Sequence, residues 1–459
     1  MDLQMIWSLL AELRQLRQRE HWTRQQLEAY QANTLRSLRE YVYAYSPFYQ
    51  RFHKGLTDRP LHELPVLTKA MLMEHFDELV TDRTIHLEEV KAYVARPSVD
   101  EPFLGRYLVN ATSGSTGQPG LFLFNRAEWL TVLASFARSR EWTGIKANLT
   151  SRTKMAVVAS TTPWHMSALV SKTLHSWWVP EVRLSASEPI ETIVRRLNEW
   201  QPEVLVCYAS MARLLADEQQ KEHLKIAPRA VFTSSEVLTD DTRRRIEDVW
   251  GKTLFNQYSA TECGGIAAEC DYHHGLHLYE DMIIVEVVDK GNRPVPPGTY
   301  GDKLLLTVLF HRSQPLIRYE LSDSVRLASS SCLSGLPFAL LDGIQGREED
   351  VLYFPARAGG EVAVQPLVFS QVLDTTPVSG WQVVQETNGI RVLLSGVRGD
   401  LTDETLATTM KQALGKQGAH VPSVTIERVS AIPRTTNGKA PLIKANRSHG
   451  SLASEPLVP

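Results

Sequence analysis

The chain has 459 residues, of which 43% are hydrophobic and 22% are charged, and its formal net charge is −3. This composition is that of an ordinary globular protein, and the charge excludes a strongly basic nucleic-acid-binding surface. No apolar run reaches the roughly 18 residues of a membrane span. The N-terminus lacks a signal-peptide pattern and the four cysteines are too few for a disulfide scaffold, so we expect a cytoplasmic protein with no membrane partner.

The first part of the chain is predicted to be helical. Residues 4–45 carry apolar side chains at three- and four-residue spacing, which is typical of an amphipathic helix. A further helix is expected within residues 60–80, where Thr68 is placed to cap its N-terminus.

Residues 155–258 alternate between short apolar stretches and amphipathic ones. The predicted strands are 155–160, 203–208, 230–235 and 253–258, and the predicted helices are 189–200, 209–219 and 239–250. Such alternation predicts βαβ units with a parallel sheet. Ligands of parallel sheets lie beyond the carboxyl ends of the strands, so Ser234–Glu236 and Ser259–Glu262 are candidate site residues.

The rest of the chain is richer in strands. Residues 282–289 and 303–310 predict an antiparallel pair. Beyond a Gly-bounded junction at 342–350, the sequence predicts a small α+β domain. Its expected elements are a hairpin over 381–396 with an Asn388–Gly389 turn, a helix over 402–418 capped by Thr402, and a strand over 423–430. We therefore expect an α/β protein with domains 1–346 and 347–459, the first combining parallel sheets with a β-rich subdomain.

The stretch "NATSGSTGQPGLFLF" at residues 110–124 concentrates small hydroxyls and glycines. A flexible surface loop is one interpretation. A phosphate cradle is the other, because glycines let backbone N–H groups approach an anion and hydroxyls add donors. The stretch is not the P-loop of NTPases, since it lacks the G-x-x-x-x-G-K-[ST] pattern.

Six motifs in one order resemble those of the adenylate-forming superfamily of acyl-CoA ligases, and within it the phenylacetate–coenzyme A ligase family. The resemblance covers most of residues 60–445. The motifs are "TSGSTGQPG" (112–120), "TSSEVL" (233–238), "YSATECGG" (258–265), "IRYELSD" (317–323), "GREED" (346–350) and "PRTTNGK" (433–439). The resemblance implies a large adenylate-forming domain, a small mobile C-terminal domain, and ATP with Mg²⁺ as cofactors.

The resemblance also implies a role for each motif residue. The phosphates of ATP would be held by Thr112, Ser113, Gly114, Ser115, Thr116 and Gly117. The adenosine would be bound by Ser235, Glu236, Tyr258 and Asp323, with Asp323 accepting from the ribose hydroxyls. Glu262 would help to hold Mg²⁺. The catalytic contacts to the α-phosphate and the reacting carboxylate would come from Thr261, Arg347 and Lys439.

Two departures from the family pattern concern the second half-reaction. Glu349 is the candidate pivot of the small domain, where the family commonly has Asp. Residues 351–366 are longer than the family's short loop beside the thiol channel, and they carry no basic cluster for the 3′-phosphate of CoA. A mobile loop is expected there. Adenylation is therefore expected to proceed, with free CoA a poor acceptor beside a carrier-protein thiol or an amine.

Some members of the family carry a structural zinc between the "YSATECGG" motif and the hinge. Three residues of the matching region are of ligand type, namely Cys270, His277 and Cys332. Ser334 stands where a fourth ligand cysteine would be, and a tetrahedral zinc takes four N or S ligands, so the sequence weighs against zinc. The alternative is two buried cysteines beside a hydrogen-bonded His277. His273 or His274 would complete the set if zinc binds.

The sequence says least about which carboxylic acid would be the substrate. By their order in the chain, Trp164, His165 and Tyr208 would line its pocket, although aromatic residues are more often core than pocket. An aryl or acyl acid is favoured, because no Asp of the kind that grips an α-amino group is identifiable. The alternatives to a ligase are an adenylyltransferase that moves AMP to a hydroxyl and a non-catalytic relative.

Overall fold

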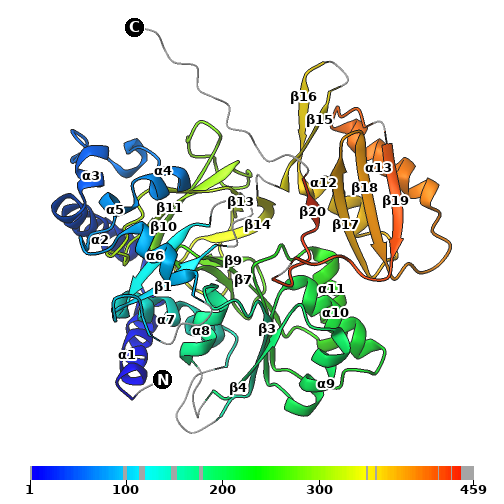
Figure 1. Ribbon diagram of the computed structural model, residues 1–459, viewed down its shortest axis with the longest axis horizontal. Coiled ribbons are helices and arrows are strands. Elements are labelled where there is room, and N and C mark those ends of the chain that lie inside the picture. The colour runs from blue at the N-terminus through cyan, green and yellow to red at the C-terminus, as the bar shows by residue number, and fades with distance from the viewer. Residues whose placement is uncertain are drawn as a thin grey trace. The chain divides into compact units, whose positions relative to one another are not determined.

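The computed structural model describes residues 3–96, 101–112, 119–145, 152–174, 179–347, 350–356, 359–421, 423–435 and 437–445 (Figure 1). Residue contacts divide the chain into two compact units. The first comprises Met1–Glu348 together with Thr435–Lys439, and the second comprises Glu349–Arg434 together with Ala440–Pro459. No helix in the described part is long and apolar enough to cross a membrane.

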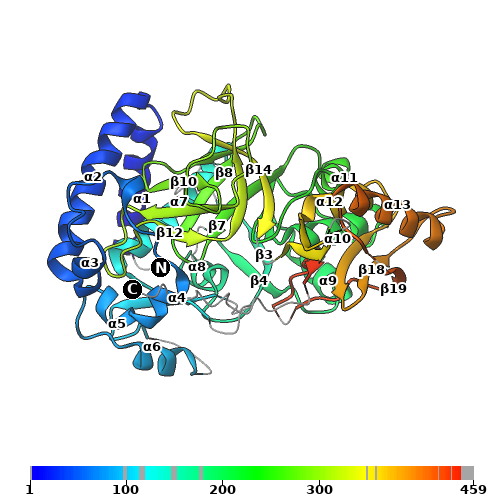
Figure 2. The same ribbon diagram turned by 90° about the horizontal axis from the view of Figure 1, so that it is seen from above.

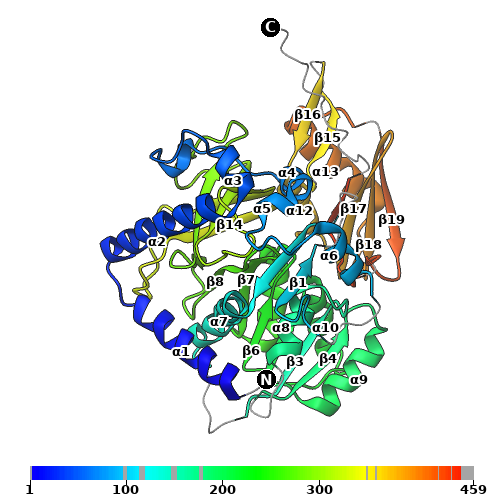
Figure 3. The same ribbon diagram turned by 60° about the vertical axis from the view of Figure 1, so that its left-hand side comes forward.

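The N-terminal segment forms two helices, α1 (Leu3–Arg19) and α2 (Arg24–Tyr45), instead of the one helix predicted. Thr23 separates them, since its side chain accepts from the backbone N–H of Gln26 while the Gln26 side chain accepts from the Thr23 N–H. This capping box starts a new helix. In Figure 3, α1 lies beside α7, against which it packs. Short helices follow: α3 (Pro47–Phe52), η1 (Leu61–Glu63), α4 (Lys69–Glu74), α5 (Phe76–Leu79) and α6 (Leu87–Val94).

A nine-stranded sheet, counted over the described residues, organises the first unit in the order β13-β14-β9-β8-β7-β6-β5-β3-β4. From β7 to β4 its strands are parallel, as the sequence predicts for β3, β5, β6 and β7, while β4 was not predicted. Figures 1 and 2 show α8 on one side of β3 and β4 and α9 and α10 on the other. The bounds are β3 (Met155–Ala159), α8 (Met166–Leu174), β4 (Glu181–Ser185), α9 (Ile190–Trp200), β5 (Val204–Cys207), α10 (Ala209–Gln220), β6 (Ala230–Thr233), α11 (Asp240–Trp250) and β7 (Leu254–Ala260).

The other half of this sheet is antiparallel and was not predicted from the sequence. Its strands β8 (Gly264–Glu269) and β9 (Leu276–Leu278) are buried throughout, so they lack the alternation that marks a half-exposed strand. The sheet continues through β14 (Leu340–Arg347) and β13 (Asp323–Leu327).

Two smaller sheets complete the first unit. β10 (Ile283–Val288) and β11 (Lys303–Val308) form the predicted antiparallel pair, to which β12 (Tyr319–Leu321) adds. β1 (Tyr107–Ala111) pairs with β2 (Leu121–Asn125), and α7 (Arg126–Trp142) follows directly. The hairpin β1–β2 therefore brackets the Ser/Gly-rich stretch.

The second unit has its own core around a sheet in the order β19-β18-β17-β20. The predicted hairpin is present, but its register pairs Glu386 with Gly389, so the turn residues are Thr387 and Asn388. A Cβ at Gly389 would overlap the carbonyl oxygen of Ser423. Glycine is therefore required here for the close approach of β19, and it is not a turn residue. The bounds are α12 (Pro366–Leu373), β17 (Gly380–Glu386), β18 (Gly389–Ser395), α13 (Asp403–Lys416), β19 (Ser423–Val429) and β20 (Ile443–Lys444).

The segment 351–366, for which the sequence predicts a mobile loop, forms the hairpin of β15 (Leu352–Pro355) and β16 (Glu361–Val364). Leu352, Phe354 and Val364 are buried in the core of the second unit. These three side chains hold the two strands to the core, so the prediction of a mobile loop was wrong for β15 and β16.

Candidate active site

The carboxyl ends of β3, β5, β6 and β7 come together because the strands are parallel and adjacent in register. Ser160 follows β3 and Tyr208 follows β5. Both are buried, and the backbone N–H of Ser160 donates to the Tyr208 hydroxyl over 2.8 Å. Burial raises the pKa of Tyr208 to about 12, so its hydroxyl stays protonated at neutral pH. The predicted pocket residue Tyr208 is thus fixed to the end of the neighbouring strand.

The segment after β6 has an unusual backbone at one predicted adenine-binding residue. Ser235 adopts φ +66°, a left-handed conformation that is uncommon outside glycine and asparagine and is enriched at functional sites. The carboxylate of the next residue, Glu236, accepts from the backbone N–H of Ser210 at the start of α10, over 2.9 Å. A carboxylate at a helix N-terminus is favoured by the helix dipole. Glu236 therefore joins the ends of two adjacent strand–helix connections.

The turn between β7 and β8 carries the next two candidates. Tyr258 lies within β7, and Thr261 and Glu262 form the turn that Gly264 ends with φ +80°. Glu262 is only 7% exposed, and the hydroxyl of the buried Tyr319 lies 3.5 Å from its Oε1 atom. A nearly buried carboxylate at a strand end is a suitable oxygen ligand for a divalent cation.

Thr112 and Gly120 lie at the two ends of the Ser/Gly-rich stretch and are hydrogen-bonded to each other, and we call this pair the neck. The N–H of Thr112 donates to the carbonyl of Gly120 over 3.0 Å, and its hydroxyl accepts from the Gly120 N–H over 2.7 Å. The predicted phosphate-binding residues Ser113–Gly117 lie outside the described residues, as does the pivot candidate Glu349. Thr112 thus has a defined part in the hairpin, and the lone pairs of its hydroxyl are partly used by Gly120.

Asp323 and Arg347 are 24 residues apart in sequence but directly opposite one another in the register of β13 and β14. The predicted ribose-binding residue and the predicted catalytic arginine are therefore paired across the two strands. The side chain of Arg347 lies outside the described residues.

The lysine loop groups with the first unit. Within it, the Thr435 N–H donates to the carbonyl of Lys439 over 2.8 Å, and Gly438 adopts φ +78° where a Cβ would crowd Ala186. The ammonium of Lys439 lies 5.6 Å from the ring centroid of Tyr208, a cation–π distance. Lys439 is therefore half-buried beside the ends of β3 and β5.

His165 lies in the same region. Its Nδ1 atom is 2.8 Å from the Ser160 hydroxyl. Burial, followed by the charges of Lys439 and Arg183, lowers the pKa of His165 to about 4. The imidazole is therefore neutral at pH 7 and serves as a hydrogen-bonding group beside the lysine.

Comparison with known proteins identifies the family. Residues 62–305, more than half of the chain, match the family model described as AMP-binding enzyme. This chain belongs to the AMP-binding enzyme family. Phenylacetate-coenzyme A ligase of Thermus thermophilus is 26% identical over 385 residues, covering 80% of each protein. Protein CapK of Staphylococcus aureus is 22% identical over 284 residues, covering 60% of this chain and 56% of the relative.

The solved structures agree on the fold. A crystal structure of 2-hydroxyisobutyryl-CoA ligase in the postadenylation state, in complex with 2-HIB-AMP, matches with a TM-score of 0.72 at 22% identity, covering 94% of this chain and 91% of that one. The resemblance and the α/β fold class predicted from the motifs are confirmed.

A cluster of ligand-type residues in this AMP-binding enzyme lies apart from these strand ends. Ligand atoms of Cys270, His277 and Cys332 lie within 4.8 Å of one another. The two sulfurs are 3.7 Å apart, and Ser334 Oγ lies 3.3 Å from His277 Nε2. Burial lowers the pKa of His277 to about 4.

Neither of the two other histidines suggested by the sequence joins this cluster in the described structure. His273 stacks on Phe255, and its Nδ1 atom lies 3.6 Å from Glu269, while His274 is exposed.

Sequence reasoning missed two residues of the site. Tyr319 lies inside the quoted "IRYELSD" motif, but its approach to Glu262 depends on the pairing of β12 with β11. Ser160 is the last residue of the predicted strand 155–160 and directly follows β3, so its position at a carboxyl end was the available signal.

Proposed function

We propose that this enzyme is an ATP-dependent ligase that activates a carboxylic acid as an acyl adenylate and passes the acyl group to an acceptor thiol. Membership of the AMP-binding family supports this proposal. The observation that carries it is that Glu236 and Glu262 follow the adjacent parallel strands β6 and β7, while Lys439 lies beside Tyr208, which follows β5.

In the first half-reaction a carboxylate oxygen of the acid attacks the α-phosphorus of ATP. The bond from the α-phosphorus to the bridging oxygen breaks, and pyrophosphate leaves with that electron pair. Both reactants are anions, so cationic and hydrogen-bonding groups must offset their repulsion. Lys439 is proposed to contact the α-phosphate and the carboxylate, and Thr261 to donate to the α-phosphate. Mg²⁺, held with the help of Glu262, would neutralise phosphate charge.

Nucleotide binding is proposed to use the residues at the neighbouring strand ends. Tyr258 would stack on the adenine beside Ser235 and Glu236, and Asp323 would accept from the ribose hydroxyls, with Arg347 on the same rung. The loop that begins after Thr112 would hold the remaining phosphates through backbone N–H groups and hydroxyls.

Coenzyme A is the proposed acceptor in the second half-reaction. Its thiolate would attack the acyl carbon, and AMP would leave with the acyl-phosphate oxygen. The names of the Thermus relative and of the matching crystal structure both describe CoA ligases. The expectation that free CoA is a poor acceptor rests on two grounds: a mobile loop within 351–366, where β15 and β16 instead pair, and the lack of a basic cluster there for the 3′-phosphate. A carrier-protein thiol or an amine is the alternative acceptor.

A structural zinc bound by Cys270, His277 and Cys332 is also proposed. Zinc–sulfur bonds of about 2.3 Å at a tetrahedral angle put two sulfurs about 3.8 Å apart. The observed sulfur separation of 3.7 Å fits this value. Ser334 beside His277 provides the fourth position with a hydroxyl, a weaker ligand than the cysteine it replaces.

ATP–pyrophosphate exchange across a panel of aryl and aliphatic acids tests the proposal. Acid-dependent exchange supports adenylation, and mass spectrometry after addition of CoA identifies the product. Exchange without any acyl-CoA would remove CoA as the acceptor. Acid-independent transfer of AMP to a hydroxyl would instead establish an adenylyltransferase, and the absence of both reactions would indicate a non-catalytic relative.

A further inference from the structure

The outer edge of strand β2 is buried and is completed by side chains. Among the described strands β2 pairs with β1 alone, so the backbone groups on its other edge need partners. Leu121 and Leu123 are fully buried, which excludes bulk water as that partner. A buried unpaired backbone group costs about 1–3 kcal/mol, so this edge requires a substitute for a third strand.

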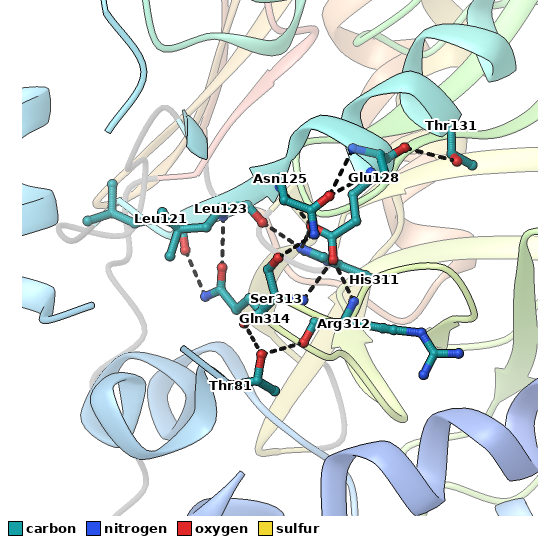
Figure 4. A network of polar contacts seen from close by, with 11 residues as sticks. Thr81, Leu121, Leu123, Asn125, Glu128, Thr131, His311, Arg312, Ser313 and Gln314 are labelled. Atoms are coloured by element: carbon teal, nitrogen blue, oxygen red, sulfur yellow. Dashed lines mark hydrogen bonds and ion pairs between the residues drawn. The ribbon is translucent and has the colours of Figure 1, made fainter. Parts of the chain in front are cut away.

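Gln314 supplies most of that substitute (Figure 4). Its side-chain Nε2 donates to the carbonyl of Leu121 over 3.0 Å, and its Oε1 accepts from the N–H of Leu123 over 2.9 Å. The His311 ring donates through Nε2 to the carbonyl of Leu123 over 2.6 Å. The amide of Gln314 therefore imitates the donor and acceptor of a neighbouring strand, and its orientation is fixed because the two partners differ in kind.

The turn that carries Gln314 is itself held on two sides. Glu128 accepts from the backbone N–H groups of Arg312 and Ser313 at 2.8 and 2.7 Å. Thr81 donates through its hydroxyl to the carbonyl of Arg312 over 2.9 Å and through its N–H to that of Ser313 over 3.1 Å. Figure 4 shows these contacts converging on the turn from separate elements. Gln314 is itself fully buried, so its side chain has a fixed position against β2.

The position of β2 determines where the Ser/Gly-rich stretch returns to the fold. Leu121 directly follows Gly120, whose backbone forms both hydrogen bonds with Thr112 at the neck. Gln314 is hydrogen-bonded to Leu121, so it fixes the position along β2 at which Gly120 meets Thr112. Displacing this strand along its axis would displace Gly120 and with it the closure of the neck on Thr112.

We infer that Gln314 is a positioning residue for the phosphates of ATP, acting through β2 and the Thr112–Gly120 neck. This inference rests on the proposed function, in which that stretch binds the phosphates. Gln314 touches no substrate in this account. Its loss is expected to weaken ATP binding selectively, while the acid and acceptor sites keep their geometry.

The test compares Gln314→Met with a matched substitution elsewhere. Gln219, a half-buried residue of α10, also donates to a backbone carbonyl and accepts from a backbone N–H, here both of Ile226, over 2.8 and 3.2 Å. Gln219→Met therefore removes a pair of hydrogen bonds of the same kind without touching the neck. Both variants are expected to lower the melting temperature.

Only Gln314→Met is expected to raise the KM for ATP in the exchange assay, by about tenfold, with the KM for the acid within twofold of wild type. Gln219→Met should leave both values unchanged. If Gln314→Met does not fold, Gln314→Asn keeps the amide but is too short to reach both backbone groups, and the same direction is expected. A lowered melting temperature with an unchanged KM for ATP would overturn the inference.

Failure of the inference and failure of the proposed function give different results. If wild type exchanges pyrophosphate but the variants keep its KM for ATP, the inference alone fails. If wild type binds ATP in calorimetry without exchange, the proposed function fails, and the Kd for ATP of Gln314→Met against Gln219→Met still decides the inference.

Discussion

Lys439, Glu262 and Asp323 are residue types that face solvent in most proteins, and none indicates chemistry alone. Their order among the six motifs identified them in the sequence. The structure adds a physical setting for two of them, because Glu262 is nearly buried and Lys439 lies over an aromatic face. At the residue scale, the sequence therefore named the candidates, while the approach of Tyr319 to Glu262 became visible only through strand pairing.

Replacing Lys439 with Ala is expected to lower the rate of ATP–pyrophosphate exchange by about 10²–10³, because one preorganised charge contact to the transition state is lost. The loop makes its own hydrogen bonds through the backbone and Thr435, so folding should be unchanged. Calorimetry should still detect ATP binding. Lys416→Ala, at the exposed end of α13, is the control. Near-normal exchange in the Lys439 variant would refute its role.

Replacing Glu262 with Gln is expected to raise the Mg²⁺ concentration needed for half-maximal exchange and to lower the maximal rate. The amide keeps the shape and an acceptor oxygen but loses the charge that a hard divalent cation prefers. A Mg²⁺ titration of the exchange rate measures the change. An unaltered titration curve would assign Glu262 to the hydrogen-bonding network around Tyr319 alone.

His53 gives a prediction about pH. Burial, followed by the charge of Arg39, lowers its pKa to about 4 from an ordinary 6.5. The unfolded chain thus binds more protons between these values, so the stabilisation is complete above about pH 6.5 and is lost as pH falls towards 4. The loss by pH 5 is expected to be up to about 2 kcal/mol. His53→Gln should lose less stability than wild type between pH 7.5 and 5 in urea unfolding; parallel curves would contradict this.

At the scale of elements, four parallel strands were predictable as short apolar runs between amphipathic helices, whereas β4 and α8 were not predicted. Prediction failed where tertiary contacts override local pattern. Strand β8 is mostly Gly and Ala and β9 has three residues, β15 and β16 are held by three core side chains, and Thr23 divides an otherwise continuous helical pattern. The turn assigned to Asn388–Gly389 was wrong because the glycine is required by β19, an element remote in sequence.

The cysteine cluster links β9 to the chain around residue 332, and it allows a test by metal analysis. Inductively coupled plasma mass spectrometry is expected to find about one zinc ion per chain in the purified enzyme. The Cys332→Ser variant should lose this zinc. Cys207→Ser, at a buried cysteine outside the cluster, is the control. Ser334→Cys should slow the release of zinc to a chelator, since a thiolate is a stronger ligand than a hydroxyl. Protein without zinc in both wild type and Ser334→Cys would indicate two buried thiols instead.

At the scale of the whole molecule, the two units have separate hydrophobic cores. The sequence predicts a boundary near residue 346, and the contacts divide the chain between residues 348 and 349. The predicted boundary rests on a Gly-bounded junction that precedes a change of pattern. Sequence reasoning did not anticipate that Thr435–Lys439 groups with the first unit, because a five-residue loop carries no periodicity.

The core of the second unit predicts that residues 349–445 fold when expressed alone. Leu394 in β18 is fully buried between the paired strands β17 and β19, and Leu394→Ala is expected to destabilise the fragment by about 2–5 kcal/mol through the cavity it leaves. Trp381, the sole tryptophan after residue 348, is buried and donates to Asp374 over 2.9 Å, so its fluorescence reports this core. A cooperative urea transition with blue-shifted emission is expected for the fragment, at a lower midpoint for Leu394→Ala.

Leu333→Ala in the full-length enzyme, at an exposed leucine, is the control for a neutral substitution. A fragment whose tryptophan emission is already that of exposed indole without urea would show that this core is insufficient by itself.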